Sequence, residues 1–155
     1  MTLDLSKIKS EANQDREAEI RAAENEQKIK KGVIKHREDI KEWFISLFEG
    51  ENIDLRSNME TSVLFHGGTE IGLFFNLIEK SQSGVMVQNT DRADFYFQKI
   101  KNGKPIVRVT FTDLTKYLEL DQDSKAYEYE LSNPDQRVNV KFSELEKLLQ
   151  YVVDK

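Results

Sequence analysis

The stretch VLFHGGTEIG, residues 63–72, gathers the residue types best able to do chemistry, because it holds one of the two histidines and three of the seven glycines of the chain. A His-Gly-Gly sequence can form the oxyanion loop of a lipase-like hydrolase, but that chemistry also needs a G-x-S-x-G turn for the nucleophile, and the chain has none. Phosphate-binding loops follow G-x-x-x-x-G-K-[ST] or G-x-G-x-x-G, and these glycines match neither pattern. Adjacent glycines are typical of a two-residue hairpin turn, since both can adopt positive φ. We therefore predict a turn at Gly67-Gly68, with His66 at its surface.

Other residues offer little for catalysis or metal binding. The chain has no cysteine, which leaves neither disulfides nor thiolate zinc ligands. The other histidine, His36, lies in a segment of helical spacing, and we expect it on the surface of that helix or in its apolar seam. The acidic run 113–135 departs from a calcium loop, because Lys125 replaces the third ligand and the required glycine is missing. We predict no catalytic residue, no metal site, no cofactor and a protein that is not an enzyme.

The elements that would position any site divide the chain in three. Every aromatic residue lies at or after Trp43, and aromatic side chains supply much of the area that a core buries. Residues 50–155 are therefore predicted as the core domain. Residues 15–49 contain no proline, are rich in Ala, Glu and Lys and are followed by a stop at Gly50, which predicts one long helical arm whose last turns pack on the core. Residues 1–14 are predicted to be a flexible N-terminus, and the order of residues 1–28 is left open.

After residue 51 the apolar residues alternate as they do in strands. Strands are expected within 84–90, 93–111, 125–131 and 137–142, whereas residues 70–80 are left open between strand and helix. A three-residue loop at 101–103 is predicted, because it brings five apolar residues to one face: Phe95, Phe97, Val107, Val109 and Phe111. Residues 111–120 are expected to form a short helix, and residues 143–155 a terminal helix. The predicted fold is α+β, an antiparallel β-sheet packed by a long N-terminal helix and a C-terminal helix.

Two surfaces are candidates for binding a protein partner. On the arm, four residues alternate by four and three positions, as in a coiled-coil seam: Ile29, Val33, His36 and Ile40. This seam is predicted to bind another protein or a second copy of the chain as a homodimer, and the alternative is that it packs on the core of its own chain. The second surface is acidic and comprises Glu119, Asp121, Asp123, Glu128 and Glu130. It is interpreted either as a solvated edge or as a surface for a basic protein patch or a mimic of nucleic-acid phosphates.

A net charge of −5 argues against tight nonspecific binding to phosphate backbones, so nucleic acid is not the expected partner. The alternative function is nevertheless a single-stranded nucleic-acid-binding module that uses one hairpin face, with Tyr96, Lys99, Lys101, Lys104 and Arg108. A further alternative is a small-ligand or hydrolytic domain with an unrecognised site.

The favoured function is a non-catalytic protein-binding protein of the adaptor, chaperone-like, immunity or inhibitor type, which acts through the acidic surface and the helical arm. No run approaches the roughly 18 apolar residues that a membrane span needs, and the N-terminal residues lack the apolar region of a signal peptide. We therefore expect a cytoplasmic protein without membrane contact.

Overall fold

A computed structural model describes residues 3–51, 54–57, 61–121, 123–133 and 136–155. Within this part, seven strands form one antiparallel sheet in the order β1-β2-β3-β6-β7-β8-β9, which with its two α-helices confirms the α+β class. The helices are α1 (Ser6–Ser46) and α2 (Leu145–Asp154), the latter preceded by the short 3-10 helix η1 (Phe142–Glu144). The strands of the sheet are β1 (Asp54–Ser57), β2 (Thr61–His66), β3 (Thr69–Phe75), β6 (Phe95–Lys101), β7 (Lys104–Asp113), β8 (Glu128–Asn133) and β9 (Gln136–Lys141). A separate two-stranded hairpin comprises β4 (Ile78–Lys80) and β5 (Met86–Gln88).

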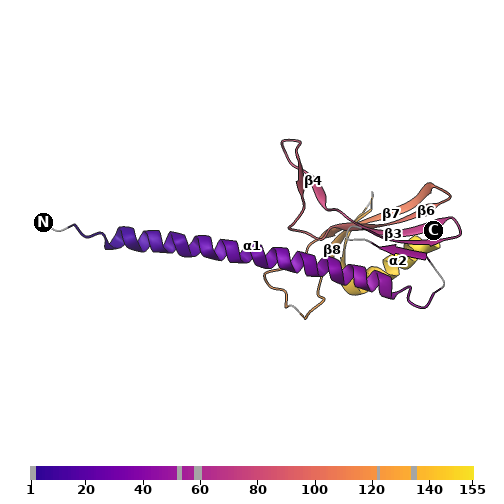
Figure 1. Ribbon diagram of the computed structural model, residues 1–155, viewed down its shortest axis with the longest axis horizontal. Coiled ribbons are helices and arrows are strands. Elements are labelled where there is room, and N and C mark those ends of the chain that lie inside the picture. The colour runs from indigo at the N-terminus through magenta and orange to yellow at the C-terminus, as the bar shows by residue number, and fades with distance from the viewer. Residues whose placement is uncertain (1–2, 52–53, 58–60, 122, 134–135) are drawn as a thin grey trace.

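Helix α1 is longer than predicted and begins at Ser6, inside the segment that was predicted to be flexible. Figure 1 shows its C-terminal part beside the sheet and its N-terminal part projecting far beyond the domain. Every residue from Ser6 to Lys28 is exposed, whereas one face is buried from Val33 onward. At 1.5 Å per residue, the exposed part is roughly 35 Å long.

The core lies between the sheet and the two helices. Alternate residues of β3, β6, β7 and β8 meet apolar residues of α1 and α2, and the buried cluster includes Ile40, Phe44, Leu73, Phe95, Phe97, Phe111, Tyr129, Leu145, Leu149 and Val152. Each large side chain buried in this way stabilises the fold by about 1.5–3 kcal/mol. Segment 70–80, left open in the sequence, is strand over Thr69–Phe75 and Ile78–Lys80.

The turn between β2 and β3 confirms the prediction for the glycine pair. His66 pairs with Thr69, which leaves Gly67 and Gly68 as the two turn residues. Their φ angles are +55° and +84°, the region where a Cβ atom is strained. His66 is exposed beside the turn, as expected.

The turn between β6 and β7 corrects the predicted three-residue loop. Lys101 pairs with Lys104, so Asn102-Gly103 is a two-residue turn with positive φ at both positions. The register then shifts between Lys99 and Ile100, and Ile106 is the extra residue of the β-bulge. The bulge restores the predicted shared face while the turn keeps its favoured Asn-Gly geometry.

The predicted helix over 111–120 is wrong, because β7 continues to Asp113 and a turn follows. The carboxylate of Asp113 accepts the backbone N–H of Thr115 at 2.9 Å, and this local bond competes with helix formation. Two apolar residues of this segment, Leu114 and Leu118, are exposed and do not pack on the core as an amphipathic helix would require. The segment is therefore a loop, and it lies against α1 where the arm leaves the domain.

Candidate functional site

Six residues that are distant in the sequence form a buried polar group, the His36 cluster. Its members are His36 and Asp39 on α1, Asp113 at the end of β7, Tyr117 in the loop between β7 and β8, Tyr127 directly before β8, and Tyr129 on β8. The exposed fraction of His36 is 0 %, so the ring lies wholly inside the protein. A buried polar side chain needs hydrogen-bond partners, and the other cluster members supply them.

The directions of these hydrogen bonds fix the tautomer of His36. The hydroxyl of Tyr117 donates to the carboxylate of Asp113, and His36 Nδ1 lies 2.6 Å from the same hydroxyl oxygen. Because that hydroxyl has a single proton, Nδ1 must carry a hydrogen and donate it to the Tyr117 oxygen. In the neutral ring Nε2 is then the acceptor, and Tyr129 donates to it. The donors thus form a chain from Tyr129 through His36 and Tyr117 to Asp113.

Asp113 remains ionised at the end of this chain. Burial opposes its charge, but the nearby His36 ring and the backbone N–H groups of Ala93, at 2.8 Å, and Thr115, at 2.9 Å, outweigh burial. Together they hold the pKa of Asp113 at about 2. Asp113 is therefore the negative charge on which this hydrogen-bond chain ends.

His36 is held neutral. Burial lowers the pKa of His36, and the carboxylate of Asp113, 3.6 Å from Nδ1, only partly offsets it. The hydrogen-bond chain works in the same direction as burial. A proton on Nε2 would turn that nitrogen into a donor, and the described residues offer the Tyr129 hydroxyl no other acceptor.

Tyr127 and Tyr117 both contact α1 and hold it against the loop between β7 and β8. The ring of Tyr127 stacks on His36 with a centroid distance of 3.6 Å, and its hydroxyl donates to Asp39, which also binds Lys35 at 2.9 Å. A Cβ atom at Gly32 would lie 2.7 Å from a ring carbon of Tyr117, so this glycine permits close contact of helix and loop. The cluster therefore fixes the position at which the arm leaves the domain.

The His36 cluster contains the groups of a general acid–base site, but its geometry is that of a structural anchor. Both ring nitrogens of His36 are bonded within the chain and the ring is fully buried, so no substrate reaches it in this conformation. The position agrees with the expectation that His36 lies in the apolar seam of the helix and corrects the alternative that it lies on the helix surface. In the sequence, the buried contacts of His36 are indicated only by its place as a polar residue within an apolar stripe, because such a residue needs hydrogen-bond partners when it is buried.

The seam predicted to bind a partner packs on its own chain. Val33, His36 and Ile40 are buried in the domain and Ile29 is half-buried, so the alternative interpretation describes these residues. Their apolar surface is already used by the core and by the loop after β7. A protein partner or a second copy would meet the exposed half of α1 instead.

A cleft opens at the root of the arm. Its volume is about 680 Å³, and α1 forms one wall while the loop after β7 forms the other. The lining residues are Ala22, Asn25, Glu26, Ile29, Asp91, Thr115, Lys116, Tyr117, Leu118 and Glu119. Lys28 Nζ donates to the carbonyl oxygen of Leu118 at 3.3 Å and ties the two walls together. The cleft is apolar at Ala22, Ile29 and Leu118.

The predicted acidic surface divides between this loop and the sheet. Glu119, Asp121 and Asp123 are exposed on the loop, and Glu119 lines a second hollow of about 290 Å³ together with Glu128. Glu130 is half-buried on β8 and lies 3.7 Å from Arg137 of β9. Of the loop carboxylates, Glu119 therefore lines the cleft, whereas Glu130 is paired on the sheet.

The residues of the nucleic-acid alternative do not form one continuous face. Lys99 Nζ donates to the carbonyl oxygen of Val153, so it lies on the face that α2 covers. The ring of Tyr96 has Phe74 stacked on one side at 5.0 Å and the guanidinium of Arg108 on its ring at 3.7 Å. A base that stacks on Tyr96 would compete with these two contacts. Lys101 and Lys104 are exposed at the turn.

Among the described helices, none has both the length and the hydrophobicity of a membrane span. Within the same residues, no three histidine, aspartate or glutamate side chains are placed to hold a metal ion. Comparisons with protein-family models, with curated proteins and with solved structures find no match for this chain.

Proposed function

We propose that the chain is a non-catalytic protein-binding protein whose binding site is the exposed half of α1 together with the cleft at its root. The observation that carries this proposal is the complete exposure of Ser6 to Lys28. The described contacts of this segment with the domain lie near its C-terminal end, as in the bond from Lys28 to Leu118, and a helix with so little tertiary support is marginal in water. An ion pair such as Glu26 with Lys30, at 3.0 Å, adds only about 0.3–0.5 kcal/mol. A partner that covers the arm would supply the missing contacts.

The chemistry of the cleft defines the kind of partner. Its apolar floor suits one or two apolar side chains, which are the usual anchors of an interface. Its charged rim carries Glu26, Asp91 and Glu119 against Lys116. The excess of carboxylates favours a partner with lysine or arginine beside the apolar anchor, and the neighbouring Asp121 and Asp123 would speed its association.

The experiment uses two leucines of the same loop. Leu118 lines the cleft and is 47 % exposed, whereas Leu114 is 41 % exposed and is not among the residues that line the cleft. Full chain, Leu118→Asp, Leu114→Asp and a chain lacking residues 1–28 are used to capture proteins from a nuclease-treated extract of the native host. A partner that is then purified is titrated against each variant.

The partner should bind the full chain and Leu114→Asp with equal affinity. It should bind Leu118→Asp and the truncated chain at least about tenfold more weakly, a loss of about 1.4 kcal/mol or more in binding free energy. Equal affinity for all four proteins would refute the cleft and the arm as the site. The behaviour of the purified partner decides between adaptor, chaperone-like, immunity and inhibitor roles. A chain without cysteine also suits a reducing compartment, which supports the cytoplasmic location proposed here.

A further inference from the structure

The hairpin of β4 and β5 projects from the domain and packs on neither face of the main sheet (Figure 1). Its base is fixed, because Arg37 of α1 donates to the carbonyl oxygens of Asn89 at 2.8 Å and Arg92 at 3.0 Å. A two-stranded hairpin is only marginally stable by itself. Strands β4 and β5 therefore extend into solvent from a base that Arg37 holds in place.

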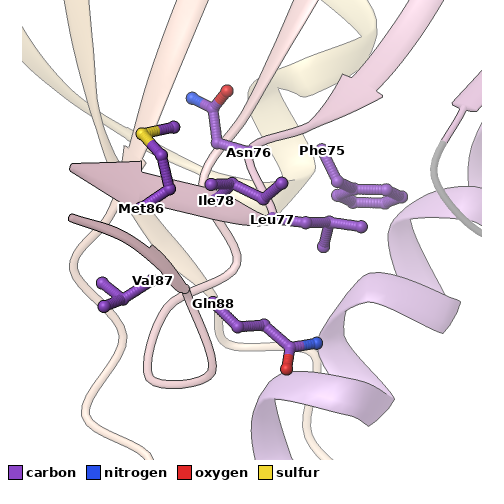
Figure 2. Close-up of a pocket in the computed structure, with 7 residues that line it drawn as sticks. All are labelled: Phe75, Asn76, Leu77, Ile78, Met86, Val87 and Gln88. Atoms are coloured by element: carbon purple, nitrogen blue, oxygen red, sulfur yellow. The ribbon is translucent and has the colours of Figure 1, made fainter.

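The hairpin exposes apolar side chains on both strands. Ile78, Val85, Met86 and Val87 are all exposed. Figure 2 shows the hollow at the hairpin, about 520 Å³ in volume, with Phe75 and Leu77 on its inner side and Val87 on the opposite side, pointing away from them. Exposed apolar groups gathered in this way mark interaction surfaces.

The same segment lacks charge. Residues 81–90, SQSGVMVQNT, form the longest run without Asp, Glu, Lys or Arg in a chain that is 33 % charged. The next longest runs, 61–69 and 71–78, fall largely in β2 and β3 of the main sheet, where neutrality serves the core. In the hairpin the absence of charged residues is not explained by burial in a core, since residues 82–88 are all exposed.

Edge strands usually carry charges that prevent pairing with another chain. Of the described edges, β1 carries Arg56, β9 carries Arg137 and Lys141, and β4 carries Lys80, whereas β5 is Met-Val-Gln. We propose that β5 pairs antiparallel with β5 of a second copy of this chain, so that two hairpins form one four-stranded sheet around a twofold axis.

Charge favours β5 over β4 as the pairing strand and permits β5 to pair with its own copy. Antiparallel pairing of β4 about its central residue would place Glu79 opposite its own copy, and like charges that face each other across strands are destabilising. Pairing of β5 about Val87 sets Val87 opposite its copy and Met86 opposite Gln88, which brings no charges together. The interface is smaller than the roughly 800 Å² per partner of standard stable complexes, so the dimer is reversible and depends on concentration.

The first test compares two apolar residues of equal exposure. Val87 and Ile106 are each 45 % exposed, but Ile106 lies on β7, away from the hairpin. Sedimentation equilibrium at protein concentrations up to about 1 mM gives the dimer dissociation constant of the full chain, Val87→Lys and Ile106→Lys. Val87→Lys should weaken the dimer at least about tenfold and Ile106→Lys should leave it unchanged, with both variants melting like the parent. A chain that stays monomeric over this range, or an equal effect of the two substitutions, would overturn the proposal.

The second test uses the absence of native cysteine. Residues opposite each other in an antiparallel pair have Cβ atoms about 4.5–5.5 Å apart, so Val87→Cys should form a disulfide-linked dimer when oxidised glutathione accepts the two electrons. Gln82→Cys, at the exposed tip of the same hairpin, would be roughly 15 Å or more from its copy and should react much more slowly. Equal rates would contradict the twofold pairing. A chain lacking residues 1–28 should dimerise normally, so failure here and failure of the arm proposal are distinguishable.

Discussion

Replacement of Tyr117 by phenylalanine tests whether the His36 cluster anchors α1. The change removes one oxygen and keeps the ring that packs on Gly32, so the helix–loop contact is retained. It leaves His36 Nδ1 without its acceptor and takes one donor from the Asp113 carboxylate, which keeps the N–H groups of Ala93 and Thr115. Hydrogen bonds to charged groups contribute about 1.5–3 kcal/mol. We expect a loss of that size in the free energy of unfolding at neutral pH.

Urea unfolding followed by circular dichroism measures this loss, and thermal unfolding should show a midpoint about 3–12 °C lower for a chain of this length. The control is Tyr151→Phe, because Tyr151 is exposed on α2 and its hydroxyl is outside the cluster. If Tyr117→Phe unfolds within about 0.5 kcal/mol of this control, the hydrogen-bond chain does not anchor the helix and the assignment of the His36 tautomer loses its support.

Unfolding of the same two proteins at acidic pH provides a second measure of the Tyr117–Asp113 hydrogen bond. The folded pKa of Asp113, about 2, lies below its usual value of 3.8. Its contribution to stability is therefore complete above pH 3.8 and is lost as the pH falls toward 2, and a difference of this size corresponds to about 2 kcal/mol. Loss of the Tyr117 donor should raise the folded pKa of Asp113 and move acid unfolding to higher pH. Acid transitions at the same pH in both proteins would contradict this reasoning.

Three further predictions concern the same helix. Because the pKa of His36 is lowered in the folded state, the unfolded state binds a proton first, and stability should fall as the pH drops below about 6.5. His36→Gln should flatten this slope in urea titrations between pH 7 and 5, and an unchanged slope would contradict this reasoning. Gly32→Ala should lower the melting temperature although alanine favours helices by about 1 kcal/mol, because its Cβ meets the Tyr117 ring; a higher melting temperature would show that the ring moves aside. Deletion of residues 1–28 should leave a cooperative melt close to that of the full chain, since these residues are exposed, and loss of the transition would place them in the core.

Local features were predictable from the sequence because their causes are local. The turn at Gly67-Gly68 follows from the conformational freedom of two adjacent glycines. The alternation of apolar residues in β6 and β7 correctly predicts that they share one face of the hairpin. It does not predict the loop length, because the preferred turn and the shared face require different loop lengths in a regular hairpin. Asn102-Gly103 favours a two-residue turn, and the structure satisfies both preferences with a bulge at Ile106. A bulge needs one residue without a partner on the facing strand, and nothing in the sequence indicates that Ile106 is that residue.

The hydrogen-bond partners of His36 could not be predicted, because they are distant from it in the sequence. Spacing by three and four residues predicts an apolar face but not what that face packs against. The residues that bind His36 are separated from it by 81 positions for Tyr117 and 93 for Tyr129. A single sequence does not show which distant positions are in contact, so the seam was compatible both with a partner protein and with the core of its own chain. Only the presence of a histidine among apolar residues indicated a buried polar contact.

Tyr117 connects the anchor of the arm with the proposed binding cleft. Its hydroxyl belongs to the His36 cluster and the same residue lines the cleft, whereas its neighbour Leu118 lines the cleft without a part in the cluster. Substitutions at these two positions therefore separate stability from binding. Leu118→Asp should reduce partner affinity with little change in unfolding, because the leucine is exposed. Tyr117→Phe should do the reverse, because the ring that lines the cleft is kept. If both variants lose affinity in proportion to lost stability, the partner recognises the folded domain as a whole and the cleft is not the site.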